Sequence, residues 1–393
     1  MTVIILDGHL KSALTAIRSL GEAGVAVVCG SSKSWAMGSF SCFTQERFMY
    51  LDPCTNRKRF LEMVQTKAGD VKANTGEKPL ILCFSDATQN ALFDTYEEGT
   101  SDFRLVCASR ASYEIARSKT KTYELARRLG VPTIRTYEPS HYSEVAYPAV
   151  VKYAQSVVWT EGGCVRGSAE FVFSKEELEA KVADITGKSG EAPVVQTFVK
   201  GGEYGVEMVC EKGEALATFV HKRIRSLSPR GGAAVVKETA QKNEQTNEML
   251  EYANRLVREL LWTGPVMVEF KVDAKTEEVL LMEINGRFWG SLPLAVKAGV
   301  DFPLMVYKLA CGQAQKMPVT FSAPAVRTRH FLGDVLWVWR VFFARDRLRS
   351  HLYPSRLHAW WDFKKEIFLS HSDTFSWSDT LPWLMEYFAI LRR

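Results

Sequence analysis

The sequence predicts an α/β protein in three parts. Over residues 1–108, short apolar runs alternate with helical patterns, which is typical of a small parallel sheet. Residues 109–325 hold strand-like runs joined by polar or glycine-rich turns, with a small α/β unit expected at about 145–195. Residues 326–393 are expected to form a helical extension, and 327–393 hold six of the ten tryptophans.

The composition argues against several classes of protein. A chain of 393 residues with 46% hydrophobic residues is ordinary globular material, and a net charge of +5 is too small to indicate a nucleic-acid partner. The eight cysteines include no Cys-x-x-Cys pair, which favours a reducing compartment and no zinc site. Met1 leads into an apolar strand rather than a signal peptide, and no uncharged apolar run is long enough to span a membrane. We therefore expect a cytoplasmic protein.

In the N-terminal part, the helix is expected at Leu10–Leu20 and the strands at Val3–Leu6, Val25–Cys29, Ile81–Phe84 and Arg104–Cys107. The turn at 7–12 lacks the Gly-x-Gly-x-x-Gly needed for close approach to a dinucleotide, so NAD binding is disfavoured. Four polar residues follow predicted strands, at the edge where ligands collect in open α/β sheets: Asp7, His9, Ser85 and Asp86. They are either substrate-site candidates or satisfied turn residues.

Two lysines lie at the ends of predicted elements. Lys119 begins a helix that Gly130 and Pro132 terminate, and alone it would be a surface lysine. Lys152 ends an apolar strand at 147–153, where a buried ammonium group needs a partner. The glycine-rich segment 160–168 follows. It is either a flexible hairpin turn or a loop whose backbone N–H groups close over phosphates.

The next strand, at 192–200, leads into Gly201, Gly202 and Glu203, and alone Glu203 would be a solvated loop acid. A hairpin at 204–221 then delivers the densest basic segment of the chain, 221–232, which is expected to be a loop. No aromatic platform is interleaved with its charges, which argues against a nucleic-acid partner. A surface loop and an anion site remain as alternatives.

The stretch 266–303 is the most informative. Its strands, 266–273 and 278–284, are joined by a polar turn, which brings Glu269 near Glu283 and places Asn285 on the same face as Glu283. Adjacent carboxylates are costly unless they are neutralised, and Mg²⁺ held by few protein ligands and by phosphate oxygens is the natural partner. Arg287 adds a cationic fork suited to a phosphate or carboxylate. The alternative is an edge hairpin with solvated acids.

Taken in order, these motifs resemble the ATP-grasp superfamily, and within it the predicted carboxylate–amine ligases related to the carbamoyl-phosphate synthase large subunit. The resemblance covers about 115–303 and does not extend into the tail. It implies an ATP-grasp fold with an N-terminal Rossmann-like pre-ATP-grasp domain, a small α/β lid and an α-helical C-terminal extension. Ser118 stands where the family often has Asp, and Met267 stands where some dipeptide-forming relatives have Arg, so carboxylate recognition cannot be carried over from those relatives.

The resemblance also implies roles for particular residues. Glu269, Glu283 and Asn285 would hold Mg²⁺, for which Mn²⁺ could substitute. Arg287, with Lys222 or Arg223, would stabilise the phosphates, and Arg225 would bind the acceptor. The residues expected to contact ATP are Lys119, Lys152, Glu161, Gly162, Gly163, Gln196, Thr197, Phe198, Val199 and Glu203.

The predicted activity is that of an ATP-dependent carboxylate–amine ligase, which forms an amide or peptide bond through an acyl phosphate and releases ADP and phosphate. Small-molecule carboxylate and amine substrates, the latter resembling amino acids, are the expected partners, with a homodimer as an open alternative. Two other functions remain open: phosphoryl transfer or ligation to a non-amine nucleophile, and a non-catalytic ATP-binding module docking on a membrane or a biosynthetic partner. The basic tail could lie on a membrane surface, although helices wrapped over the other domains are favoured.

Overall fold

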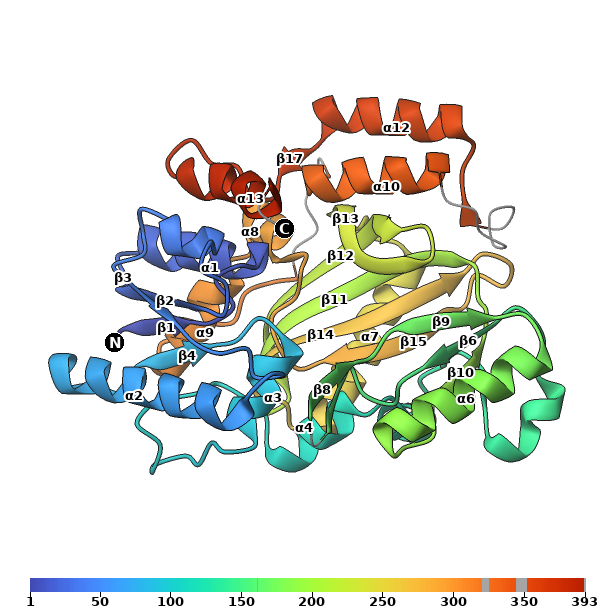
Figure 1. The fold of residues 1–393 in the computed structure, drawn as a ribbon, viewed down its shortest axis with the longest axis horizontal. Coiled ribbons are helices and arrows are strands. Elements are labelled where there is room, and N and C mark those ends of the chain that lie inside the picture. Colours follow the sequence, from blue (N-terminus) through green and yellow to red (C-terminus); the bar gives the residue numbers. More distant parts are fainter. Residues whose placement is uncertain (161, 320–324, 344–351, 392–393) are drawn as a thin grey trace.

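The computed structural model describes residues 1–160, 162–319, 325–343 and 352–391 (Figure 1). A four-stranded parallel sheet begins the chain, in the order β3 (Glu46–Met49), β2 (Val27–Ser31), β1 (Val3–Ile5) and β4 (Leu80–Leu82). Its helices are α1 (Lys11–Glu22), α2 (Arg57–Thr75) and α3 (Asp86–Phe93). The strand expected at 104–107 was wrong, since only Arg104 pairs with the sheet, in a single bridge to Leu80.

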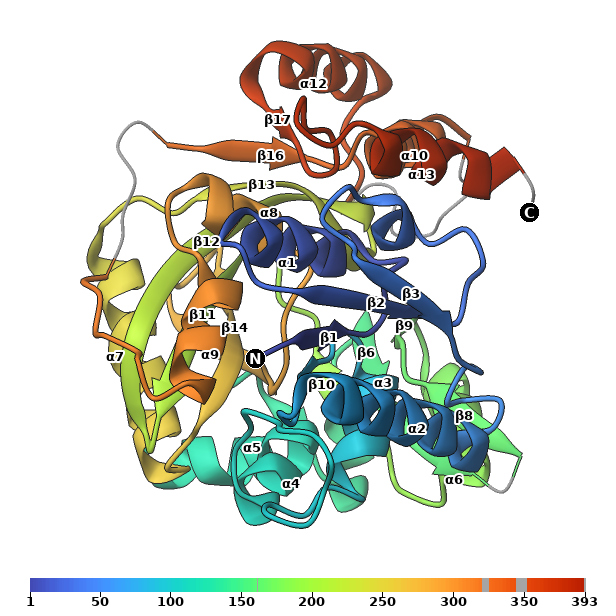
Figure 2. The same cartoon turned by 90° about the vertical axis from the view of Figure 1, so that its left-hand side faces the viewer.

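The strands of this sheet are buried on both faces because their side chains alternate between two apolar layers. Val3 and Ile5 pack in the layer that contains α1, whereas Ile4 packs with Phe60 and Val64 of α2. Figure 2 shows α1 and α2 on opposite sides of the sheet. This sandwich places the loops after β1 and β4 at one edge, which faces the rest of the chain.

A second, antiparallel sheet has the order β5 (Thr136–Tyr137), β10 (Val194–Thr197), β6 (Ala149–Lys152) and β9 (Ala169–Val172). Helix α6 (Lys175–Ser189) covers one face through Leu178 and Ile185. Between β6 and β9 the chain forms a separate hairpin, β7 (Val157–Thr160) and β8 (Gly163–Arg166). We call this sheet with α6 and the hairpin the small unit.

The central sheet has seven strands in the order β15, β14, β11, β12, β13, β16 and β17. Their bounds are β11 Gly201–Glu211, β12 Glu214–Ser228, β13 Gly231–Thr239, β14 Gly264–Asp273, β15 Val279–Asn285, β16 Arg327–Arg329 and β17 His371–Ser372. The basic segment expected to be a loop is therefore mostly strand, because β12 continues to Ser228 and pairs with β13.

The two faces of the central sheet differ in chemistry. Helix α7 (Glu244–Glu259) covers one face, where Met249 and Leu256 pack on Val206, Met208 and Val268. Alternate residues point to the other face, so Glu203, Glu207 and Glu269 share it. The helices α8 (Leu292–Lys297) and α9 (Phe302–Ala310) connect part of this second face to α1. The remaining part carries the charged residues of the site.

Two further helices, α4 (Arg110–Arg117) and α5 (Lys119–Arg128), precede the small unit. In the tail, α10 (Phe331–Phe343), α12 (Arg356–Leu369) and α13 (Leu381–Leu391) lie over the N-terminal and central sheets (Figure 1). The tail is not purely helical, since β16 and β17 extend the central sheet. Within the ranges given above, no helix is both long and apolar enough to cross a membrane.

The tail is tied to both sheets by buried ion pairs. Asp373 Oδ2 accepts hydrogen bonds from Lys11 of α1 and Lys237 of β13, and both the Lys237 and the Asp373 side chains are fully buried. Asp379 pairs with Arg18 of α1 at 2.9 Å. The tail therefore joins the N-terminal part to the central sheet, as the favoured alternative for this segment expects.

Candidate active site

A cavity of about 680 Å³ lies between the charged face of the central sheet, the small unit and the N-terminal part. Its walls come from widely separated parts of the chain, including Lys11, Lys152, Gln196, Glu269 and Arg287. Most of the residues predicted from the sequence to bind ATP or metal line it. The cavity is therefore the candidate active site.

The two predicted metal-binding acids lie opposite one another. Residue Glu269 of β14 pairs in register with Glu283 of β15, as the predicted hairpin requires. Asn285 Nδ2 donates to Glu269 Oε1 at 3.0 Å and to Glu283 Oε1 at 3.1 Å. Three side chains thus converge on one point of the sheet.

The electrostatics of the two acids differ. Burial and the neighbouring Glu283 charge raise the pKa of Glu269. Burial alone would also raise the pKa of Glu283, but Lys119 and the Asn285 amide outweigh it and lower that pKa to about 2. Lys119 Nζ lies 3.3 Å from Glu283. The repulsion between the two carboxylates is offset by Lys119, by the Asn285 amide and by Arg223, which lies 3.3 Å from Glu269, and a divalent cation would offset it further.

The residues present fit a Mg²⁺ ion. Two carboxylates supply oxygen ligands, with the Asn285 amide held between them, and Mg²⁺ commonly takes few ligands from the protein and the rest from phosphates and water. In the described ranges, no cluster of three or more His, Cys, Asp and Glu side chains could hold a metal ion.

Both predicted lysines line the cavity. Lys119 is the first residue of α5, whose N-cap is Ser118. Lys152 ends β6, and burial lowers its pKa to about 8 despite the nearby Glu283 carboxylate. Two cations beside the acidic pair would bind an anion such as a nucleotide phosphate.

The segment after β10 forms a third wall, through Gln196, Thr197, Phe198 and Val199. Gln196 is buried, and its Nε2 donates to Thr136 Oγ1 at 3.1 Å. Its Oε1 has no hydrogen-bond partner among the described residues. A buried carbonyl oxygen without a donor is costly, and the exocyclic amino group of adenine would satisfy it. The residues of this wall therefore fit a bound adenine.

Glu203 also lines this wall, beside the candidate adenine position. It accepts from Arg223 at 2.7 Å and from Lys271 at 3.1 Å. These two cations hold its pKa below the ordinary value, although burial acts in the opposite direction. Glu203 is thus an ionised carboxylate that accepts hydrogen bonds from Arg223 and Lys271, and not the solvated loop acid of the alternative interpretation.

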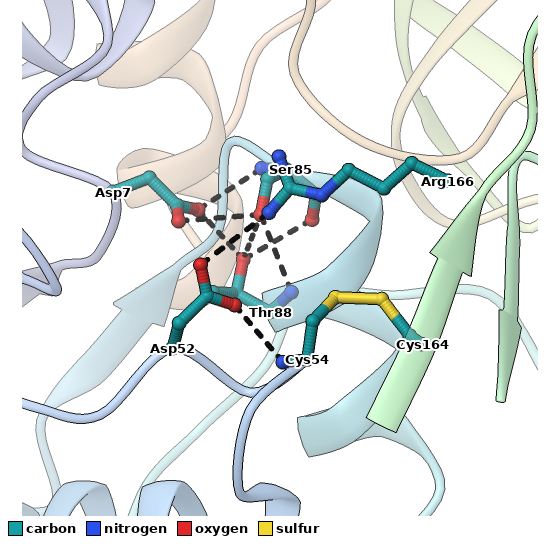
Figure 3. The surroundings of a disulfide bond; sticks show 7 residues. All are labelled: Asp7, Asp52, Cys54, Ser85, Thr88, Cys164 and Arg166. Atoms are coloured by element: carbon teal, nitrogen blue, oxygen red, sulfur yellow. Dashed lines mark hydrogen bonds and ion pairs between the residues drawn. A yellow bond between two sulfur atoms is a disulfide. The ribbon is translucent and has the colours of Figure 1, made fainter. Parts of the chain in front are cut away.

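The glycine-rich hairpin does not lie where the sequence predicted. Gly162 and Gly163 are absent from the cavity lining, whereas Gly167 and Ser168 are part of it, and Glu161 lies outside the described residues. The hairpin tip instead contacts the loop at 52–56. Figure 3 shows the disulfide from Cys54 to Cys164 beside the Arg166–Asp52 ion pair, which spans 3.5 Å. The expectation of only reduced cysteines was therefore wrong for this pair.

The predicted basic residues separate. Arg223 faces the cavity and reaches Glu269 at 3.3 Å, but Lys222 lies over the Tyr204 ring, 5.8 Å from its centroid, and does not line the cavity. Arg225 is buried against the tail, where it pairs with Asp334 and stacks on Trp337. An irregularity in β12–β13 pairing lies between Arg223 and Arg225. The structure thus places Arg225 outside the cavity predicted to hold the acceptor.

Arg287 lines the cavity and is held by a residue from the N-terminal part. Asp86, at the start of α3, accepts from Arg287 Nε and Nη2, each at 2.8 Å. Asp7 is a satisfied turn residue, since its carboxylate accepts from the Phe84 and Ser85 backbone N–H groups at 3.0 Å. His9 pairs with Ser31 Oγ at 3.3 Å, and burial lowers its pKa.

Sequence reasoning missed several cavity residues. Three of them are Lys11, Lys271 and His221. They reach the cavity because segments that are far apart in the sequence pack together. The position of Asp86 after a predicted strand was a signal, but its partner was not apparent. Lys271 could have been found by alternation, two residues from Glu269 on the same strand.

The geometry agrees with comparisons to known proteins. A family model described as "ATP-grasp in the biosynthetic pathway with Ter operon" matches residues 190–330. The chain is 28% identical over 190 residues to the mitochondrial carbamoyl-phosphate synthase (ammonia) of Aquarana catesbeiana, a match covering 47% of this chain and 12% of that protein. It is 26% identical over 193 residues to the C-terminal section of the carbamoyl phosphate synthase large chain of Methanopyrus kandleri, covering 46% and 34%.

A solved structure resembles most of the chain. The biotin carboxylase domain of Hydrogenobacter thermophilus 2-oxoglutarate carboxylase, a dimer in complex with MgADP, ADP and bicarbonate, superposes with a TM-score of 0.61 at 15% identity. The match covers 81% of this chain and 71% of that chain. The likeness shows a shared fold. The two sequence relatives, by contrast, are matched over well under half of their length.

Proposed function

The chain is a member of the ATP-grasp superfamily and has its fold, and on that basis we propose that it is an ATP-dependent carboxylate–amine ligase. It would activate a carboxylate as an acyl phosphate, join it to an amine, and release ADP and phosphate. Small molecules are the proposed substrates on both sides. The sequence relatives, named as carbamoyl-phosphate synthases, support carboxylate chemistry of this kind.

One observation carries the proposal. Glu269 and Glu283 oppose one another in register and line the same cavity as Lys119 and Lys152, and the buried Asn285 beside them donates to both acids. Two partly buried carboxylates at paired positions of neighbouring strands are costly for stability alone, so their placement beside a cationic cavity favours a functional role.

Each residue then has a physical role in the reaction. When bound with ATP, Mg²⁺ supplies neutralisation of the phosphate charge and alignment of the transferred group. Lys119 and Lys152 add positive charge where negative charge accumulates. Gln196 would offer its unpaired Oε1 to the adenine amino group, and Glu203, which lines the same cavity, would accept from the ribose. Arg287, fixed by Asp86, presents its remaining N–H groups to a phosphate or carboxylate.

The test is phosphorus NMR of the protein with MgATP, a pool of amino acids and a pool of small carboxylates. We expect ADP and inorganic phosphate that depend on the pools. Glu283→Gln should abolish their formation because it removes one metal-binding charge. Glu278→Gln is the matched control, since Glu278 belongs to the same hairpin and is exposed.

The outcomes separate the reaction classes. AMP and pyrophosphate would contradict acyl-phosphate chemistry. ADP without inorganic phosphate, with the phosphoryl group on a pool component, would replace ligation by phosphoryl transfer. Equal turnover by Glu283→Gln and the unaltered protein would refute the assigned metal site.

A further inference from the structure

A histidine and a buried glutamate form a second polar cluster on the charged face of the central sheet. His221 of β12 places Nδ1 2.8 Å from Glu207 Oε1, and Ser291 Oγ donates to the same oxygen at 2.5 Å. The exposed fraction is 3% for the His221 side chain and 0% for that of Glu207. His221 and Ser291 both line the cavity. The cluster is thus a buried part of the wall of the candidate active site.

A glycine makes room for the imidazole. Gly205 of β11 pairs in register with His221 on one side and with Glu269 on the other. A Cβ atom at position 205 would lie 2.3 Å from His221 Cε1 and 2.9 Å from Nδ1. Because a side chain at 205 would displace the ring, the glycine holds open the position that the histidine occupies. The same register sets His221 two strands away from the metal-binding Glu269.

The hydrogen bonds of the cluster leave one ring nitrogen available. When Nδ1 donates to Glu207, the neutral imidazole keeps a lone pair on Nε2. No hydrogen-bond partner is found for Nε2 among the described residues. Glu207 Oε2, buried and likewise without a partner there, leaves the carboxylate charge incompletely compensated. A positive charge on the imidazole would supply that compensation.

We propose that His221, oriented by Glu207 and by the space at Gly205, is the general base that deprotonates the amine substrate. This inference rests on the proposed ligase function and deepens it. It also defines the substrate class: an amine that arrives as an ammonium ion and must lose a proton before it attacks. Glu207 and Gly205 are positioning residues.

The proton balance gives His221 a definite step. One proton passes from the ammonium group to Nε2, and the freed lone pair forms the C–N bond at the acyl carbon. The bond from that carbon to the phosphate oxygen then breaks, and the second N–H proton leaves with the phosphate as hydrogen phosphate. The imidazolium is paired with Glu207 until it returns its proton to water. General bases of this kind contribute about 10²–10⁴-fold to rate.

Other charged groups share this face and bear on the pH profile. The neighbouring strands contribute, besides Glu207, Glu203 of β11, Arg223 of β12, Lys237 of β13 and Glu269 of β14, and Lys11 and Arg287 face the same cavity. Glu207 is the only acid within 4.0 Å of a His221 ring nitrogen in the described part of the chain. Among these acids, Glu207 is therefore the one closest to the imidazole ring.

The test compares two nucleophiles on one enzyme. Hydroxylamine is largely unprotonated at neutral pH and needs no base, whereas amino-acid amines are ammonium ions. With MgATP and the pool of carboxylates, His221→Gln should lose about 100-fold or more of its amine-dependent ligation at neutral pH. It should retain most of its hydroxamate formation with hydroxylamine. Raising the pH should bring the rate of amine ligation by His221→Gln closer to that of the unaltered enzyme, since free amine then becomes available without a base.

Control variants sharpen this comparison. Glu207→Gln keeps the shape but removes the charge, so it should shift the pH profile of amine ligation and spare hydroxamate formation. Gly205→Ala should reproduce the nucleophile-selective loss by displacing the ring. His141→Gln changes an exposed histidine and should match the unaltered enzyme with both nucleophiles.

The outcomes distinguish this inference from the proposed function. If the unaltered enzyme forms neither hydroxamate nor amide from any pool member, the ligase function itself fails. If it forms both and His221→Gln loses them in equal proportion, His221 serves folding or ATP use and the inference is overturned. Full amine ligation by His221→Gln would overturn it as well.

Discussion

Asp86 and Arg287, 201 residues apart, form a two-point ion pair that joins the start of α3 to the end of the β14–β15 hairpin. Burial alone would lower the pKa of Arg287, but Asp86 raises it above the ordinary value, so the guanidinium stays charged. A carboxylate that binds Nε and Nη2 fixes the plane of the fork. The N-terminal part thus orients a cation of the candidate active site.

Asp86→Asn should therefore impair catalysis more than folding. The amide keeps the volume but loses the charge that orients Arg287, whose side chain is 19% exposed against 27% for Asp86. We expect ADP formation to fall about tenfold or more, with the melting temperature lowered by a few degrees. Steady-state phosphate release and calorimetry measure both. Asp94→Asn is the comparison variant, because Asp94 pairs with Arg57 at the other end of α3 and is about as buried as Asp86. Equal activity losses in the two variants would argue against an orienting role for Asp86.

The affinity for ATP should fall as the pH rises through about 8. Burial lowers the pKa of Lys152 from 10.5 to about 8, so this cation is lost well before an exposed lysine would lose its proton. Between pH 8 and pH 10.5, Lys152 is more often protonated in the unfolded chain than in the folded protein. The group therefore makes stability rise with pH while nucleotide binding weakens.

Calorimetric titration of MgATP at pH 7 and pH 9.5 tests this opposition. In Lys152→Met the affinity should be lower at pH 7 and should vary less between the two values. Lys175, which is exposed at the start of α6, offers a control substitution, Lys175→Met. A pH dependence that persists unchanged in Lys152→Met would assign it to another group.

Reduction of the disulfide should destabilise the protein. Cys54 and Cys164 are separated by 110 residues, so the cross-link removes much chain entropy from the unfolded state. We expect the free energy of unfolding to fall by about 2–4 kcal/mol in Cys54→Ser/Cys164→Ser. Urea unfolding with and without dithiothreitol measures the effect. The double variant should be insensitive to the reductant, and sensitivity equal to that of the unaltered protein would place the relevant disulfide elsewhere.

Asp373→Asn should be among the most destabilising single changes. Its carboxylate is the shared partner of Lys11 and Lys237, and removing one partner of a buried ion pair costs about 3–5 kcal/mol. Burial already lowers the pKa of Lys237 to about 7, so this lysine is poorly placed to remain charged alone. Adding Lys237→Met should restore much of the lost stability, because an apolar side chain replaces the unpaired cation. Denaturant unfolding of the two single variants and the double variant measures the free energy of unfolding of each. If the losses of the two single variants add in the double variant, the proposed rescue is contradicted.

The geometry of the β14–β15 hairpin was predictable because the hairpin is local. Alternation along two adjacent strands is enough to bring Glu269 opposite Glu283 and to place Asn285 beside them. The same holds for Lys119 at a helix start and Lys152 at a strand end, whose positions follow from short sequence signals. Local periodicity gives which face a side chain occupies.

Long-range pairings were not predictable in the same way. Asp86 reaches Arg287 and Cys54 reaches Cys164 only because separate sheets pack together, which no local pattern encodes. The segment at 221–232 resembled a loop because its charges suggested solvent. In the structure those charges are held by partners, Arg223 by Glu203 and Arg225 by Asp334, so a strand can carry them.

The shared carboxylate of Asp373 has a consequence for biosynthesis. Lys11 leaves the ribosome 362 residues before the aspartate that holds it. The first sheet can gather its apolar residues early, since its strands lie within the first eighty-odd positions of the chain. The wall of the cavity at Lys11 is completed only when the tail has emerged. A nascent chain from which residue 373 has not yet emerged therefore has Lys11 without its buried carboxylate partner.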